Sequence, residues 1–140
     1  MTLNLRAHHI FCVPFLDAVF PDRGEEFYKI EQMIKKVMLS DDERTHIKVT
    51  EGVDQLCKEC PLCKNNRCQS TDGDEAVVRK WDALIMEELG IKTGEIFEAG
   101  EIRGVINQNA PLSVCFRCKW RKDCQMGRKT DKKMSKVQDI

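Results

Sequence analysis

Seven of the eight cysteines in this chain fall into two short segments. The first segment reads Cys57-Lys-Glu-Cys60-Pro-Leu-Cys63-Lys-Asn-Asn-Arg-Cys68, and the second reads Cys115-Phe-Arg-Cys118-Lys-Trp-Arg-Lys-Asp-Cys124. Each contains a C-x-x-C pair followed by a further cysteine, a spacing that lets a short piece of backbone direct several thiolates at one metal ion or iron–sulfur cluster. We predict that the segments meet at a metal centre with the ligands Cys57, Cys60, Cys68, Cys115, Cys118 and Cys124.

The spacing alone does not decide between an iron–sulfur cluster and a zinc ion. Bacterial ferredoxins share the C-x-x-C-x-x-C run, but their fourth cysteine follows after three residues and precedes a proline. Here Cys68 follows Cys63 after four residues and precedes Gln69. Zinc would need only a C-x-x-C pair from each segment, which leaves Cys63 as an additional candidate ligand. Both metals therefore stay open, whereas disulfides are disfavoured if the compartment is reducing.

A second group of reactive side chains lies near the N-terminus, in Arg6-Ala-His8-His9-Ile-Phe-Cys12. If this stretch is helical, His8 and His9 lie four and three residues before Cys12 and can share a face with it. The three side chains are then candidate additional metal ligands, or Cys12 is a nucleophile with a histidine as its base. On residue types alone we favour a third interpretation, in which Cys12 packs in the core and the histidines bind backbone groups.

Length and composition indicate one small domain. The chain has 140 residues, of which 33% are charged and 6% aromatic, and its formal net charge is zero. The stretch 117–140 nevertheless holds nine Lys or Arg and three Asp, a local charge of +6. We expect residues 1–128 to form a cysteine-rich metal-binding domain and residues 129–140 a basic, flexible tail.

The chain shows neither a membrane span nor a good signal peptide. The longest apolar run, residues 10–16, is far shorter than the roughly 20 residues a spanning helix needs. The N-terminal apolar stretch contains Pro14, is followed by Asp17, and has no small-residue cleavage site. We therefore expect a cytoplasmic protein without membrane association, whose cysteines stay reduced.

Hydrophobic periodicity predicts an α+β fold that is mostly α, with a minor two-stranded sheet and two cysteine-rich loops. Residues 2–6 and 46–50 alternate as paired strands do, and residues 7–20 suit a helix broken at Pro14. Amphipathic helices are expected over residues 25–39 and from about 75 to 89, and a weaker one over 95–107 because it contains two glycines. In the second of these, Asp72 would cap the start, and Leu84 is expected to face inward with Val78, Trp81, Ile85 and Leu89.

The ordered motifs resemble an uncharacterised prokaryotic family, domain of unknown function 1284. The resemblance extends to about Cys124 and implies iron–sulfur binding, without an activity. Cys63 is an addition to the family pattern, and so is the basic tail. The resemblance favours iron over zinc and brings the histidines nearer to the site. The matching positions are Arg6, His8, His9, Cys12, Cys57, Cys60, Cys68, Cys115, Cys118, Trp120 and Cys124.

The leading functional hypothesis is an iron–sulfur protein of unknown biological role, acting in redox chemistry or electron transfer with an unknown redox or protein partner. The alternative is a zinc-stabilised interaction module that binds nucleic acid through the basic tail. We do not favour nucleic acid, because the chain is neutral overall and only Trp120 is interleaved with the basic residues. A thiol enzyme using Cys12 is the second alternative, so the sequence leaves open whether the chain is an enzyme.

Overall fold

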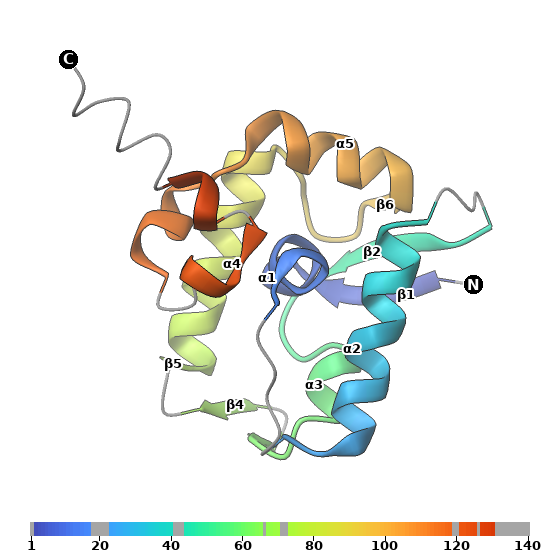
Figure 1. Ribbon diagram of the computed structural model, residues 1–140. Coiled ribbons are helices and arrows are strands. Elements are labelled where there is room, and N and C mark those ends of the chain that lie inside the picture. Colours follow the sequence, from blue (N-terminus) through green and yellow to red (C-terminus); the bar gives the residue numbers. More distant parts are fainter. Residues whose placement is uncertain are drawn as a thin grey trace.

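The main sheet has three strands in the order β1–β2–β6 and lies near the middle of the molecule in the view of Figure 1. The computed structural model describes residues 2–17, 23–40, 44–65, 67–70, 73–118, 121–125 and 127–130. β1 (Thr2–Arg6) runs parallel to β2 (His46–Thr50), which pairs antiparallel with β6 (Ile96–Glu98). The predicted pairing of the first two strands is confirmed, and the fold class is α+β, mostly α. The sheet has a third strand, however, because the segment predicted as the start of a weak helix forms β6.

Helices from both halves of the chain cover this sheet. α1 (Ala7–Cys12) follows β1 directly and continues as the 3₁₀ turn η1 (Val13–Phe15), which places Pro14 at the expected break. α1 lies between α2 (Glu25–Met38) and α4 (Glu75–Leu89) in Figure 1, and α5 (Ala99–Asn109) crosses above them. Residues 7–12 therefore occupy the centre of the fold, where they contact elements that come later in the chain.

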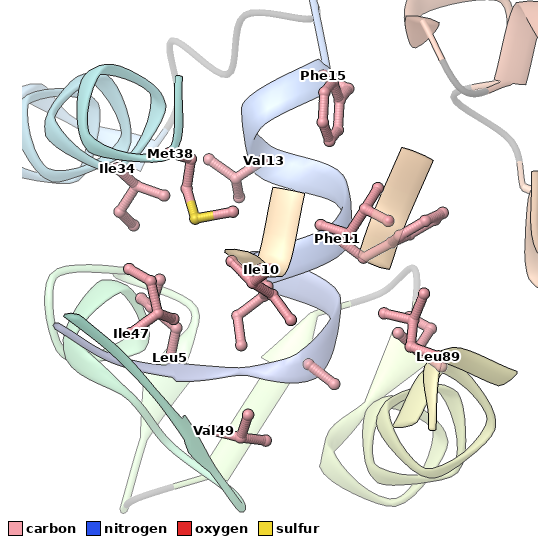
Figure 2. Close-up of a cluster of buried hydrophobic side chains, with 14 of the residues drawn as sticks. Leu5, Ile10, Phe11, Val13, Phe15, Ile34, Met38, Ile47, Val49 and Leu89 are labelled. Carbon is pink, nitrogen blue, oxygen red and sulfur yellow. The ribbon is translucent and has the colours of Figure 1, made fainter. Parts of the chain in front are cut away.

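The hydrophobic core gathers around α1. Figure 2 shows side chains of α1 and η1 pointing toward Ile34 and Met38 of α2 on one side and Leu89 of α4 on the other. Leu5, Ile47 and Val49 close the core from the sheet, and all three are fully buried. The alternation in the strands and the helical spacing in α2 predicted these inward positions.

The inner face of α4 differs from its prediction. Leu84 was expected to face inward but is 43% exposed, whereas Glu75 and Asp82 are buried. The helix begins with Asp74 as its N-cap, whose side chain accepts from the Val77 amide, and it ends at Gly90 in the left-handed conformation. Asp72, the predicted cap, lies outside the described residues. Two buried acids thus belong to the inward face of α4, where the hydrophobic spacing had predicted only apolar side chains.

Both cysteine segments contain short regular elements rather than loop alone. The first holds α3 (Gln55–Lys58), β3 (Cys63–Lys64) and β4 (Arg67–Ser70), and β5 (Gly73–Asp74) completes a second small sheet. The second segment holds the 3₁₀ turns η3 (Ser113–Arg117) and η4 (Arg121–Asp123). Trp120 and residues 131–140 of the predicted tail lie outside the described residues.

In the described part of the chain, no helix has the length and apolar character needed to cross a membrane.

Gly104 offers a test of the assignment of α5. This glycine lies inside the helix, and a Cβ built on it would meet no atom within 4 Å. Glycine in a helix interior costs about 0.5–1 kcal/mol relative to alanine. We expect Gly104→Ala to raise the free energy of unfolding by that amount in chemical denaturation. A destabilised variant would contradict the open helical environment of this position.

Candidate metal centre

The two cysteine segments and α1 meet around one cavity of about 170 Å³. A single water needs only about 10–15 Å³ of such space, so the cavity has room for a group of several atoms. Among the residues that the structure describes, seven thiols from three parts of the chain line its walls. They are Cys12 of α1, Cys57, Cys60 and Cys63 of the first segment, and Cys115, Cys118 and Cys124 of the second.

Cys12 lies beside the thiols of the second segment. Burial raises the pKa of Cys12 well above its ordinary value, and the neighbouring Cys124, Cys115 and Cys118 raise it further. The pKa of Cys115 rises to about 11, chiefly through burial and with contributions from Cys124 and Cys118. An isolated antiparallel β-bridge between Leu16 and Cys124 holds the backbone after η1 next to the second cysteine segment. Cys12, Cys115, Cys118 and Cys124, which we call the terminal thiol group, thus form one neighbourhood.

Cys57, on α3, has a cationic hydrogen-bond donor. Nη1 of Arg6 donates to its Sγ over 3.5 Å. Burial raises the pKa of this thiol to about 12, assisted by the charge of Asp54 and opposed by Arg6. Protonated thiols must lose their protons to bind a metal, so a cation that donates to sulfur favours the ligating form.

Arg6 is the centre of a buried ionic network. Its side chain is fully buried, and its Nη2 donates to Oε2 of Glu75 over 2.7 Å and its Nε to Oδ2 of Asp82 over 2.8 Å. Burial alone would lower the pKa of Arg6, but the hydrogen bonds to Glu75 and Cys57 and the charge of Asp82 raise it above its ordinary value. The network joins the end of β1 to α3 and to α4, and so holds two walls of the cavity in place.

Each of the two histidines binds a buried carboxylate through Nδ1. Nδ1 of His8 lies 2.8 Å from Oδ1 of Asp82, and Nδ1 of His9 lies 2.6 Å from Oδ2 of Asp54. The interaction with His8 and the charges of His8 and Arg6 hold the pKa of Asp82 low, although burial opposes them. The pKa of His8 itself is lowered, first by burial and then by His9. Such pairs fix the ring orientation and leave Nε2 available to a proton, a substrate or a metal.

Asp54 organises the base of the site. Within the described residues, His9, Asp54 and Cys57 bring three ligand atoms within 4.8 Å of one another. The carboxylate also accepts from the backbone amides of Arg6 (2.8 Å) and Cys57 (2.9 Å), and it caps α3. Burial alone would raise the pKa of Asp54, but His9 and these two amides hold it well below its usual range. With its oxygens engaged in this way, Asp54 orients His9 and the first turn of α3, which carries Cys57.

The structure brings together most of the sequence-predicted site residues. Cys57, Cys60, Cys115, Cys118 and Cys124 line the cavity, together with the additional candidates His8, His9, Cys12 and Cys63. Cys68 pairs with Cys63 across the β3–β4 hairpin, and its side chain lies outside the described part of the structure.

Sequence reasoning missed the carboxylates Asp54, Glu75, Asp82 and Glu31, all of which are buried. One signal was available in the sequence. Glu31 on α2 and Asp82 on α4 occupy helical positions between apolar residues of the inward face, where an acid needs a partner or a ligand.

Fold and site together define a small cysteine-rich α+β protein with a thiol-lined cavity. The family described as "Protein of unknown function (DUF1284)" matches residues 24–124, which include both cysteine segments, and the chain belongs to this family. Arg6, His8, His9 and Cys12 precede the matched residues. No curated protein matches the chain, and no solved structure does.

Proposed function

We propose that this protein binds an iron–sulfur cluster in the cavity and serves in one-electron redox chemistry. The observation that carries the proposal is the meeting of seven thiols, separated by up to 112 positions in the sequence, around one cavity. Soft thiolates select iron–sulfur clusters, Zn²⁺ and Cu(I) among biological metals. The size of the cavity favours a group of several atoms over a single ion.

The terminal thiol group is our candidate for the ligands of that cluster. Four thiolates are the usual complement of a [2Fe–2S] or [4Fe–4S] cluster, and the electrostatic influence of Cys115, Cys118 and Cys124 on Cys12 supports their proximity. Cys57, Cys60 and Cys63 face the same cavity from the first segment. They are our candidate ligands for a second centre, with Cys68 as the fourth ligand expected from the sequence. The amount of iron bound per chain would show whether the protein holds one centre or two.

The remaining walls would set the properties of a bound cluster. A cluster supplies one-electron transfer at a potential that depends on burial and on hydrogen bonds to its sulfurs. Phe27, Leu56 and Ile85 line the cavity with apolar surface and limit the entry of water. Arg6 adds a hydrogen bond and a positive charge beside Cys57, which would stabilise additional electron density on that side.

A mononuclear zinc centre in an interaction module is the alternative. It is supported by His9, Asp54 and Cys57, whose nitrogen, oxygen and sulfur ligand atoms lie within 4.8 Å of one another. A third function, nucleophilic catalysis by Cys12, has less support. The raised pKa of Cys12 disfavours a thiolate, and Nδ1 of each histidine is engaged by a carboxylate.

Metal and sulfide analysis of anaerobically purified protein tests the proposal. We expect brown protein with broad absorption near about 400 nm, as sulfur-to-iron charge transfer gives in such clusters. Iron and acid-labile sulfide should be present in equal amounts, with at least two of each per chain. Colourless protein with stoichiometric zinc and no sulfide would reject the cluster and support the zinc alternative.

A further inference from the structure

The elements that carry three of the terminal thiols also present positive charge to solvent. Cys115 lies on η3 and is buried, whereas Arg117 at the end of the same turn is exposed. Cys124 directly follows η4 and is buried, whereas Lys122 within that turn is exposed. In the sequence, residues 113–130 contain six basic residues and a single acid. This part of the chain therefore combines buried thiols with a basic surface.

Four exposed cations define that surface, which we call the basic face: Arg117, Lys122, Arg128 and Lys129. η3 contacts both η4 and α4, and these turns lie beside α4 at the left of Figure 1. The guanidinium of Arg128 donates to the carbonyl oxygen of Lys122 over 3.2 Å, which joins two members of the face. Arg117 and Lys122 are each two residues from a cysteine of the terminal thiol group, and two residues of backbone span at most about 7 Å.

Two acids beside this face are already engaged. Asp17 accepts from Nη2 of Arg128 over 2.7 Å, and Glu88 accepts from the amide and the hydroxyl of Ser113 over 2.9 and 2.7 Å. The net charge of the chain is zero, and because residues 117–140 carry +6, the rest carries −6. A neutral protein thus concentrates its positive charge in the segment that supplies three of the four terminal thiols.

We infer that the basic face is the docking surface for an acidic one-electron redox protein, which exchanges electrons with a cluster held by the terminal thiol group. The inference rests on the proposed function, because the chemistry of the partner follows from that of the cluster. Complementary charge steers such a partner to the correct face and accelerates association. Electron-transfer interfaces are small, so a few cations and one aromatic ring, the 37% exposed Phe116 of η3, suffice.

A nucleic acid fits the basic face less well. Binding to a phosphate backbone gains its strength from many cationic contacts, each of which releases counterions. The basic face holds four cations, and Asp17 already engages one of them. A small acidic protein surface needs no more charge than that, so we favour the protein partner and make nucleic acid an outcome of the test.

Small redox reagents of opposite charge test the local potential at the face. Stopped-flow measurements would follow oxidation of the reduced protein by the anion ferricyanide and by the cation hexaammineruthenium(III). When ionic strength rises from about 10 mM to about 200 mM, the rate with the anion should fall about tenfold and the rate with the cation should rise. A neutral protein with evenly spread charge would show little dependence for either reagent, and that result would overturn the inference.

Reduced flavodoxin, a small acidic one-electron protein, is the probe for the class of partner. At low salt, Arg117→Gln and Lys122→Gln should each slow electron transfer from flavodoxin to the oxidised protein by about threefold or more, while both variants keep their iron. Lys36→Gln removes the same charge from an exposed position on α2, across α1 from α4 in Figure 1, and should leave the rate unchanged. Equal rates in all three variants would overturn the assignment of the face.

Two further results separate this inference from its alternatives. A fluorescent single-stranded oligonucleotide should not bind saturably at about 150 mM salt, and binding that Arg117→Gln weakens would assign the face to nucleic acid and overturn the redox partner. Protein purified anaerobically without iron would sink the cluster and this inference together. An iron-loaded protein whose rates ignore both salt and the substitutions would sink the inference alone.

Discussion

Arg6→Met is expected to lower the free energy of unfolding by about 3–5 kcal/mol, because it removes the buried cation that Glu75 and Asp82 share, although Arg79 and His8 remain as partners. That loss is a large share of the roughly 5–15 kcal/mol that stabilises a typical domain. For a chain of this size it corresponds to a fall in melting temperature of about 10 °C or more. Thermal and chemical denaturation under anaerobic conditions would measure it.

Arg79 provides the matched control. Its Nε donates to the same Glu75 oxygen over 2.9 Å, but its side chain is 51% exposed. An exposed ion pair contributes about 1 kcal/mol or less, so Arg79→Met should be nearly neutral. If the two substitutions destabilise the protein equally, the buried network around Arg6 does not have the structural importance assigned to it.

The second large effect is expected from Cys12→Ser. If Cys12 is a cluster ligand, serine should remove most of the bound iron, and the stability contributed by the cluster should be lost with it. For structural zinc peptides such metal binding contributes on the order of 10 kcal/mol, which sets the scale of the possible change. Val13→Ala, at the adjacent buried position in η1, should keep its iron. Iron content and melting temperature of the two variants provide the comparison.

Cys124 allows the same prediction from the other end of the chain. Cys124→Ser should lose iron as Cys12→Ser does, and the double variant should lose little more than either single variant. Non-additive loss is expected when two residues bind one centre. Additive, partial losses would indicate that the two cysteines serve separate sites or pack independently.

The sequence predicted the parts of the fold that follow simple periodicity. Residues 2–6 and 46–50 alternate, and residues 25–38 repeat at helical spacing, because each element buries one apolar face. β6 escaped prediction because three residues carry little periodicity and the strand exists through its pairing with β2. The short helical turns within the cysteine segments were not predicted either, because cysteines and charged residues in these segments do not repeat at a regular hydrophobic spacing.

The candidate site was likewise predicted only in part: the cysteines were predicted from the sequence, and the carboxylates were not. The C-x-x-C spacing predicted, without knowledge of the fold, that the two cysteine segments carry metal ligands. In the structure, cysteines from both segments line one cavity. The carboxylates required the structure, since an acid at position 54 or 82 becomes a partner of a histidine only when strands and helices distant in sequence pack together. His8 and His9 illustrate the point: residue types favoured hydrogen bonds to backbone groups, whereas both residues line the cavity and each Nδ1 meets a buried carboxylate.

X-ray absorption at the iron edge of anaerobically purified protein would examine the metal centre directly. Thiolates from both ends of the chain should give iron a shell of sulfur neighbours, with a second shell of iron that only a cluster contains. Iron surrounded by nitrogen and oxygen alone, or a preparation whose only metal is zinc, would contradict the idea that these distant cysteines hold an iron–sulfur cluster.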